Sequence, residues 1–222
     1  MFKNESAAER LVKLVFPEKC ISCGCALDSE NRSKEPLLAQ YFCEKCGSDV
    51  PRMTKRHKKA TIPLVYDGSV KRAMLNLKFS SDISSVPFFS RELEREIRTT
   101  LYGEHFDILT CVPATKRSLA ERGYNQSRLI AEGMKLDIET DFTLLRKNKV
   151  TQTQHLLDAE QRQKNIASAY EMNAGRNVSG KRILLVDDIL TTGSTCDACA
   201  LVLRLAGAKS VTAVCVAKAP DK

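Results

Sequence analysis

The most constraining stretch of the sequence runs from Ile183 to Thr195 and reads ILLVDDILTTGST. It opens with four apolar residues, Ile183 to Val186, which are too few and too β-prone for a helix and predict a fully buried strand. Two adjacent carboxylates, Asp187 and Asp188, follow this strand directly. Because ligands of open parallel sheets bind outside the carboxyl ends of the strands, we expect both carboxylates to lie at a binding site.

A run of small residues comes next, and a helix is predicted to begin directly after it: Thr191, Thr192, Gly193, Ser194 and Thr195. Their hydroxyl groups, the backbone N–H groups of the turn and the positive end of the helix together predict a cradle for one phosphate group. Asp187 and Asp188 cannot bind that phosphate because like charges repel, but they suit vicinal sugar hydroxyls or a metal bridge. A ribose site beside a cradle for its 5′-phosphate indicates a phosphoribosyl ligand. The stretch lacks the lysine of a Walker loop, which disfavours a nucleoside triphosphatase.

All thirteen positions from Ile183 to Thr195 resemble the loop that binds phosphoribosyl pyrophosphate (PRPP) in type I phosphoribosyltransferases. Such a ligand also needs a pyrophosphate site. A basic segment, ATKRSLAERGYNQ, follows Pro113 at the end of another predicted strand, and we expect it to be a loop carrying Arg117 and Arg122. Arginine binds phosphate oxygens through two parallel hydrogen bonds, so this loop is a candidate pyrophosphate site beside the first cradle.

Buried strands and amphipathic helices alternate along most of the chain. Strands are predicted over residues 62–66, 107–112, 142–145, 183–186 and 210–217, and helices over 70–77, 85–101, 125–134, 158–166 and directly after Thr195. The last helix places Cys196, Cys199 and Leu203 on one stripe, so we expect the two cysteines in the core rather than in a redox site. Near-continuous apolar strands separated by helices predict an α/β fold with a doubly wound parallel sheet.

Two Cys-x-x-Cys pairs stand near the start of the chain, Cys20 with Cys23 and Cys43 with Cys46. A glycine follows each pair and permits a tight turn, and the spacing is typical of a tetrahedral zinc site. A segment this small cannot bury enough apolar surface by itself, so zinc would supply its folding free energy. Cys25 is a further thiol that could replace Cys23 as a ligand. A redox or disulfide role for the pairs is the less favoured alternative.

Residues 51–60 contain no acid and several basic side chains: Arg52, Lys55, Arg56, Lys58 and Lys59. Such a run is either a solvated linker or a contact for a polyanion, and the sequence leaves both open. The run separates the predicted domains. Residues 1–50 hold a short N-terminal helix (7–16) and the zinc module, residues 51–60 form a basic linker, and residues 61–222 form the sheet domain.

The composition limits the environment and partners of the protein. Its 222 residues carry a formal net charge of +8, which favours polyanionic partners. No apolar run reaches the roughly 18 residues of a membrane span, and the first residues lack the apolar core of a signal peptide. We therefore expect a cytoplasmic protein without membrane insertion, whose nine cysteines are metal ligands and core residues rather than disulfides.

The order of these motifs resembles the ComF family over nearly the whole chain. The resemblance rests on the cysteine pairs, Leu77-Lys78-Phe79, the basic segment with Arg122-Gly123-Tyr124-Asn125-Gln126, the PRPP loop, and the intervening Gln154, Arg162 and Asn165. It implies a phosphoribosyltransferase-type domain behind a zinc finger. It also implies a role with the competence DNA-uptake machinery that brings transforming DNA into the cytosol of bacteria.

Two functions from different classes fit these motifs. The first is an enzyme that displaces pyrophosphate from PRPP, with Mg²⁺ bridging the pyrophosphate and the site stabilising an oxocarbenium-like ribose. Asp187 and Asp188 would be its catalytic residues and hold the ribose, residues 191–195 would hold the 5′-phosphate, and Arg117 and Arg122 the pyrophosphate. The second is a catalytically inactive module that binds single-stranded DNA or senses PRPP. Release of pyrophosphate that depends on an acceptor would separate the two.

Overall fold

The computed structural model describes residues 17–148 and 169–220, and the chain divides into two compact units. The cysteine unit comprises Met1–Pro51 and Asp67–Ser85, and the sheet unit comprises Arg52–Tyr66 and Val86–Lys222. The units are therefore interleaved along the chain, whereas the predicted domain bounds (1–50, 51–60 and 61–222) are consecutive and stay a prediction. The helices expected over 7–16 and 158–166 lie outside the described residues, as do Gln154, Arg162 and Asn165.

A parallel sheet forms the centre of the sheet unit, with five strands among the described residues in the order β1-β7-β6-β2-β3. The strands span Leu64–Val65 (β1), Ile108–Cys111 (β2), Glu139–Thr140 (β3), Arg182–Leu190 (β6) and Ser210–Lys218 (β7). Ile183 to Val186 in the middle of β6 are completely buried, as predicted for a strand covered on both faces. The expected α/β fold with a parallel sheet is confirmed.

The strand order reverses between β2 and β6, which pair from Ile108↔Ile183 to Cys111↔Val186. After β2 the chain passes through α5 (Lys116–Arg122) and α6 (Gln126–Glu132) to β3 on one side. After β6 it passes through α8 (Ser194–Leu205) to β7 on the other side. Open α/β sheets bind ligands at such a reversal, outside the carboxyl ends of the two strands.

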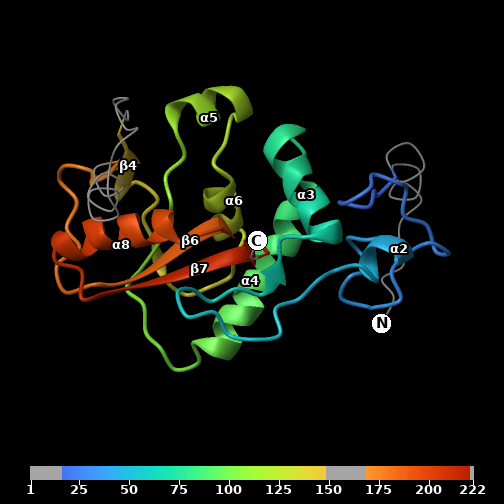
Figure 1. Ribbon diagram of the computed structural model, residues 1–222, viewed down its shortest axis with the longest axis horizontal. Helices are drawn as coiled ribbons and strands as arrows, with labels where there is room; N and C mark the ends of the chain where they lie inside the picture. The colour runs from blue at the N-terminus through green and yellow to red at the C-terminus, as the bar shows by residue number, and fades with distance from the viewer. Residues whose placement is uncertain (1–16, 149–168, 221–222) are drawn as a thin grey trace. The chain divides into compact units, whose positions relative to one another are not determined.

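Helices cover both faces of the sheet, because the right-handed crossovers on the two sides of the reversal pass over opposite faces. Figure 1 shows α8 lying along β6 and β7, where Cys199 and Leu203 pack with Ile183 and Leu185 in one buried cluster. On the other side, α4 (Val86–Thr100) packs against α6 and β7. Four of the apolar residues predicted from its helical period are buried in α4: Phe88, Phe89, Leu93 and Ile97. Leu101, which is predicted on the same stripe, lies beyond the end of α4 and is partly exposed.

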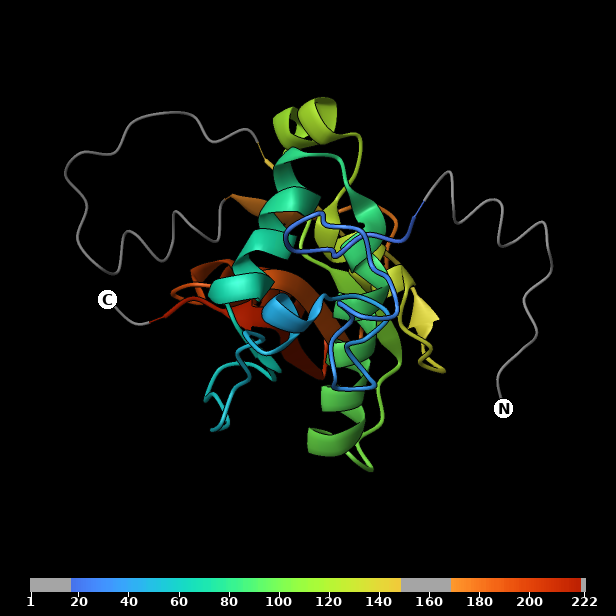
Figure 2. The same ribbon diagram turned by 90° about the vertical axis from the view of Figure 1, so that its right-hand side faces the viewer.

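The segment after β2 differs from its prediction, because α5 replaces most of the expected basic loop. Thr115 begins this helix by accepting a hydrogen bond from the Ser118 N–H at 2.9 Å, and Gly123 ends it with φ 82°. None of the α5 residues is buried, and both Figure 1 and Figure 2 show the helix standing away from the sheet at the end of two extended connections. An exposed helix has no apolar stripe, so its sequence carried no helical period.

Two other elements also differ from the sequence prediction. The strand expected over 142–145 spans Leu145–Lys147 (β4) and pairs antiparallel with β5 (Tyr170–Met172), outside the main sheet. β6 does not end at Val186 but continues through both carboxylates to Leu190. Asp187 and Asp188 therefore have strand geometry and point to opposite faces of the sheet.

The cysteine unit contains α2 (Glu44–Gly47), α3 (Gly68–Phe79) and the short 3₁₀ helix η1 (Ile83–Ser85). Asp67 begins α3 by accepting a hydrogen bond from the Gly68 N–H at 2.8 Å. The predicted stripe of α3, which includes Val70, Met74 and Leu77, is fully buried. The unit therefore has apolar core residues as well as its cysteine cluster.

Candidate functional site

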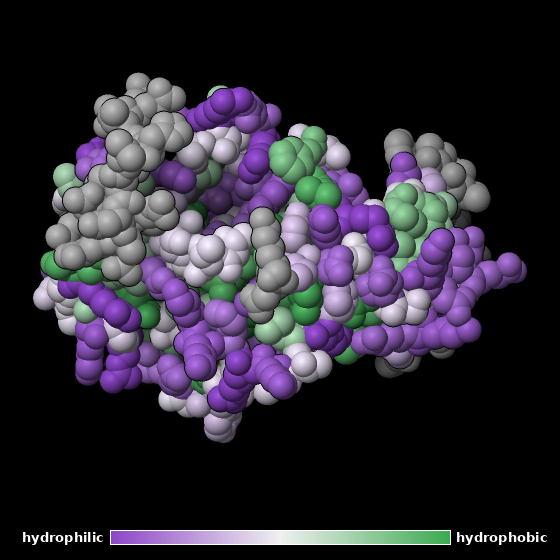
Figure 3. Space-filling view, in the orientation of Figure 1, coloured by the Kyte–Doolittle hydropathy of each residue, from purple (hydrophilic) through white to green (hydrophobic). Residues whose placement is uncertain are grey.

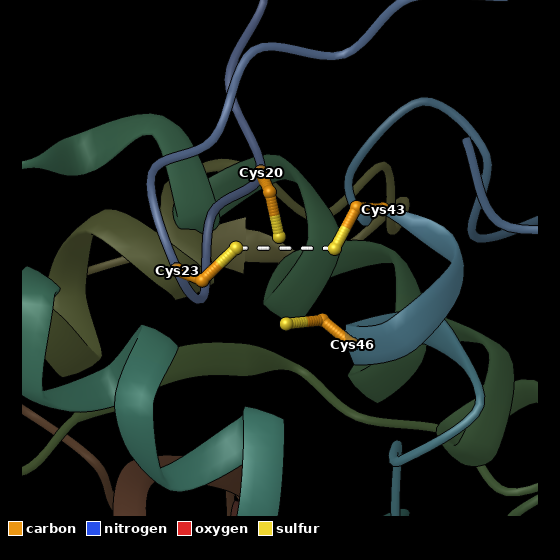
Figure 4. A group of neighbouring side chains, drawn as sticks. All are labelled: Cys20, Cys23, Cys43 and Cys46. Atoms are coloured by element: carbon orange, nitrogen blue, oxygen red, sulfur yellow. Dashed lines mark hydrogen bonds between the residues drawn. The ribbon is translucent and has the colours of Figure 1, made fainter. Parts of the chain in front are cut away.

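The four predicted zinc ligands come together. The sulfur atoms of Cys20, Cys23, Cys43 and Cys46 all lie within 4.8 Å of one another, and Figure 4 shows them pointing towards a common centre. Cys20 and Cys23 come from a tight turn in which the Gly24 N–H donates to the Cys20 carbonyl at 2.8 Å. The Cys23 and Cys43 sulfurs are 3.8 Å apart, which is about the sulfur–sulfur distance around a zinc ion with bonds of about 2.3 Å. The cluster is consistent with a zinc site.

Helix α3 supports this cluster from the side. Arg72 donates through Nη2 to the Cys46 sulfur at 3.8 Å and through Nε to Ser22 Oγ at 3.0 Å. Asn76 Nδ2 donates to the Ile21 carbonyl at 3.0 Å. Hydrogen bonds of this kind orient metal ligands and stabilise thiolate charge. No sequence motif marks Arg72 or Asn76, because α3 lies beyond the predicted zinc module.

Cys25 is not one of the four cysteines whose sulfurs lie within 4.8 Å of one another, although its side chain contacts those of Cys23 and Cys43. Its side chain is exposed and lines an open pocket together with Asp28, Asn31 and Glu44. Its carbonyl accepts a hydrogen bond from the Cys20 N–H at 2.8 Å, so its main chain helps to close the turn. The close approach of Cys23 to the other sulfurs favours Cys23 over Cys25 as the ligand.

The two carboxylates of β6 are held by several hydrogen bonds. Asp187 is 8% exposed, and its Oδ1 accepts from Ser127 Oγ at 3.1 Å and from the Asp188 N–H at 2.9 Å. Asp188 is half-buried, and its Oδ1 accepts from the Ile189 N–H at 2.6 Å. Burial raises the pKa of the nearby Cys111 thiol to about 12, and the negative charge of Asp187 adds to this effect.

The basic segment and the PRPP loop meet through these bonds. Asn125 begins α6 by accepting from the Ser127 N–H at 3.0 Å, and its Nδ2 donates to the Val112 carbonyl at the end of β2 at 2.9 Å. Ser127 in turn donates to Asp187. The two segments that the sequence assigned to different phosphate groups therefore lie side by side at the reversal between β2 and β6.

The predicted phosphate cradle forms the turn between β6 and α8. Gly193 has φ 86°, a left-handed conformation that favours glycine, and its carbonyl accepts from the Asp197 N–H at 2.9 Å. Thr191 and Thr192 are exposed, and the Thr192 hydroxyl forms a hydrogen bond with that of Ser194 in the first turn of α8. The first N–H groups of a helix have no acceptor within it, so hydroxyl and N–H donors converge at this turn.

Arg117 and Arg122 both lie on α5, in different surroundings. The Arg117 side chain is 87% exposed and pairs with Glu121 of the same helix at 2.7 Å. Arg122 Nη1 donates to Gln126 Oε1 at 3.3 Å, at the start of α6. Figure 3 shows the surface hollowed below α5, with hydrophilic residues around the hollow.

Gln126 carries an orphaned donor. Its side chain is 4% exposed, and among the described residues its buried Nε2 has no hydrogen-bond partner. A buried N–H without an acceptor costs about 1–3 kcal/mol. An oxygen of a phosphate group would satisfy it, so the surroundings of Arg122 fit an anionic ligand. The sequence placed Gln126 in a motif but gave it no role.

Two further residues reach the site from the segment before α3. The pKa of Tyr66 is raised by burial and by the negative charge of Asp188. Lys59 lies at the cradle, with Nζ 2.7 Å from Asp197 Oδ2. Both residues are distant in sequence from the PRPP loop. They reach the site because residues 52–66 pack against the sheet.

Comparison with known families agrees with this geometry. A family model described as "Phosphoribosyl transferase domain" matches residues 90–222, which include β2, α5, β6 and α8. The chain belongs to the phosphoribosyl transferase domain family. The matched region holds both the PRPP loop and the basic segment, and it excludes the cysteine cluster.

Within this family the chain is similar to proteins named for their link with DNA, as the resemblance to ComF implied. It is 32% identical over 147 residues to "DNA utilization protein YhgH" of Escherichia coli K12, which covers 64% of each chain. It is 34% identical over 93 residues to "Competence protein F" of Haemophilus influenzae, which covers 40% of this chain and 41% of that protein. The chain thus matches less than two thirds of the length of these curated relatives.

Some solved structures resemble the chain at low sequence identity. A hypoxanthine phosphoribosyltransferase from Staphylococcus aureus is 13% identical, with a TM-score of 0.39 over 61% of this chain and 64% of that chain.

In the part of the chain that the structure describes, no helix is long and apolar enough to cross a membrane.

Proposed function

We propose that this member of the phosphoribosyl transferase family binds PRPP together with Mg²⁺. Asp187 and Asp188 hold the ribose hydroxyls, residues 191–195 hold the 5′-phosphate, and Arg122 binds the pyrophosphate with help from Arg117. The observation that carries the proposal is the position of the carboxylates and the cradle. They follow one another at the end of β6, where the strand order reverses and ligands of α/β sheets bind.

The donor set around the site fits a magnesium–pyrophosphate group. Carboxylate oxygens such as those of Asp187 and Asp188 are the ligands that Mg²⁺ prefers, and the ion would neutralise charge on the departing pyrophosphate. Ser127 keeps the Asp187 carboxylate in a fixed orientation. Arg122 and the Gln126 amide offer donors to oxygens whose charge grows as the bond to the ribose breaks.

Calorimetry on the double variant Asp187→Asn/Asp188→Asn tests the site. We expect PRPP to bind at least about tenfold more weakly, a change of about 1.4 kcal/mol or more, because both sugar-binding charges are lost. Asp137→Asn, which removes an exposed carboxylate after α6, is the matched control and should bind as the natural chain does. Unchanged affinity in the folded double variant would sink the assignment.

Turnover separates an enzyme from a sensor. An enzyme releases pyrophosphate from PRPP only when its acceptor is present, whereas a sensor binds PRPP and leaves it intact. A screen of nucleobases, amines and single-stranded DNA for acceptor-dependent release therefore tests the catalytic form of the proposal. Arg122→Met should lower that release more than it lowers ribose 5-phosphate binding, because the arginine acts on the pyrophosphate.

We also propose weak binding of single-stranded DNA through Lys55, Arg56 and Lys58. These side chains are exposed, and the names printed for the similar proteins refer to DNA utilization and competence. Arg52 and Lys59 of the same run are engaged elsewhere, since Arg52 pairs with Glu92 and Lys59 with Asp197. The three exposed charges would attract backbone phosphates without reading sequence.

A triple alanine variant at Lys55, Arg56 and Lys58 tests the DNA contact by fluorescence anisotropy. We expect a lower affinity and a smaller dependence on salt, because fewer counterions are released when three charges are missing. PRPP affinity should stay the same, which makes it the internal control. If DNA affinity and its salt slope do not change, this run is a solvated segment with no nucleic-acid role.

A further inference from the structure

Lys59 covers the phosphate cradle from a segment distant in sequence. Its Nζ lies 2.7 Å from Asp197 Oδ2 and 3.5 Å from the Thr192 carbonyl oxygen. A Cβ atom added to Gly193 would stand 3.0 Å from Lys59 Cδ, tighter than most real contacts, so the stem of the lysine passes close over the glycine. An ammonium group and its aliphatic stem therefore lie against the turn at which phosphate binding is expected.

The residues after Lys59 fix it in this place. Thr61 pairs with β7, where its N–H donates to the Ala213 carbonyl at 3.1 Å and its carbonyl accepts from the Cys215 N–H at 3.0 Å. Ala60 and Ile62, on either side of Thr61, are buried in one cluster with Leu190 and Cys196. The Lys59 side chain thus extends from a segment that is packed against the end of β6 and the start of α8.

The ion pair between Lys59 and Asp197 is suited to exchange. Both side chains are about half exposed, at 50% and 55%, and ion pairs between exposed side chains contribute little to stability. Asp197 lies in the first turn of α8, where the helix dipole favours negative charge. A phosphate group bound at the same helix end has more charge and more acceptor oxygens than this carboxylate, so it would compete for the same ammonium group.

We propose that Lys59 binds the 5′-phosphate of the sugar ligand, and that Asp197 holds the lysine in position until the phosphate arrives. This inference rests on the proposed function of the cradle. It also gives the loop the cation that its own sequence lacks. In Walker loops a lysine within the loop reaches the phosphates, whereas here residue 59 of another segment supplies the charge.

Titration of the full chain with ribose 5-phosphate and, separately, with pyrophosphate tests the role of Lys59. Lys59→Met keeps the length of the stem but removes the charge. We expect it to weaken ribose 5-phosphate binding by about 10- to 100-fold, the effect of one charge-assisted hydrogen bond. Pyrophosphate affinity should change by less than about twofold, because the pyrophosphate binds near Arg122. Lys59→Arg should keep most of the affinity.

Two further variants control the experiment. Lys209→Met removes an exposed charge between α8 and β7 and should leave both affinities unchanged. Asp197→Asn removes the competing carboxylate and should keep or tighten ribose 5-phosphate binding. If Lys59→Met binds ribose 5-phosphate as the natural chain does, or weakens both ligands equally, the inference is wrong while the proposed function stands. If the natural chain binds neither PRPP nor ribose 5-phosphate, the proposed function itself fails.

Discussion

Only one of the two polar atoms of the Gln126 side chain has a hydrogen-bond partner among the described residues. Its Oε1 accepts a hydrogen bond from Arg122 at 3.3 Å, whereas its buried Nε2 has no partner among the described residues. Folded proteins pair nearly all buried polar groups, so an unpaired buried donor requires an explanation. We infer that a ligand oxygen accepts the hydrogen bond of the unpaired Gln126 Nε2. Removing the amide should therefore weaken ligand binding without lowering the stability of the unliganded protein.

Gln126→Met tests this opposition, because methionine has a similar volume and no donor. We expect PRPP to bind about 10-fold more weakly, the loss of about 1.4 kcal/mol, when a ligand oxygen loses its donor. The free energy of unfolding without ligand should stay the same or rise, since the variant removes an unsatisfied buried group. Calorimetry and urea unfolding measure the two effects. A loss of stability with unchanged binding would show that the amide is structural.

At the residue scale, site residues that are neighbours in sequence could be predicted, whereas partners that are distant in sequence could not. Asp187, Asp188 and the cradle follow one another in sequence, so the motif alone placed them at one strand end. Ser127 reaches Asp187 across 60 positions, and Lys59 reaches Thr192 across 133. No local pattern marks such contacts, because they depend on strand order and on the packing of residues 52–66.

Helix α4 contains a buried charged residue that its sequence pattern did not predict. The pattern placed Glu92 on the charged side of the helix, but the Glu92 side chain is only 2% exposed. Arg52 and Arg95 both form ion pairs with Glu92. The buried carboxylate is therefore compensated from two sides, and one of these partners ties residues 52–66 to the helix.

Arg52→Met should destabilise the sheet unit by about 2 kcal/mol. Removing one partner leaves Glu92 buried with less compensation, and breaking a buried pair costs about 3–5 kcal/mol when no second partner remains. The double variant Arg52→Met/Glu92→Leu should recover much of that loss because no buried charge is left. Arg117→Met, which disrupts the exposed pair with Glu121 within α5, is the control and should cost about 1 kcal/mol or less. Urea unfolding measures all of them, and equal losses in the single and double variants would contradict the argument.

Elements that bury an apolar face were predictable, and exposed ones were not. α4 and the stripe of α8 follow from their helical periods, and the buried part of β6 follows from its continuous apolar run. α5 has no buried residue and β3 consists of two exposed residues, so neither left a hydrophobic pattern. The hydroxyl-rich loop with Gly193 predicted that a helix begins close to Ser194, because glycine and hydroxyl residues favour a turn followed by a helix N-terminus.

At the scale of the whole molecule, the chain divides its cysteines between two units. Five lie in the cysteine unit: Cys20, Cys23, Cys25, Cys43 and Cys46. The remaining four are buried in the sheet unit: Cys111, Cys196, Cys199 and Cys215. If only the cysteine unit depends on zinc, the number of reactive thiols reports on the folding of each unit separately.

Thiol titration with and without a chelator tests that dependence. In the native protein at pH 8 we expect about one reactive thiol, Cys25, because zinc would protect its four ligands and burial protects the others. The pKa of Cys111 is about 12, so little thiolate exists there at pH 8. Chelation removes the folding free energy that zinc supplies, and the count should rise to about five.

The controls separate the ligands from the surplus thiol. Cys25→Ser should lower the native count to about zero and keep a full equivalent of zinc, whereas Cys43→Ser should lose the metal. Hydrogen exchange after chelation should increase in residues 17–51 and 67–85 and stay low in β6 and β7, because the sheet unit has its own core. If chelation instead exposes all nine thiols, the sheet unit depends on the metal and the two units do not fold separately.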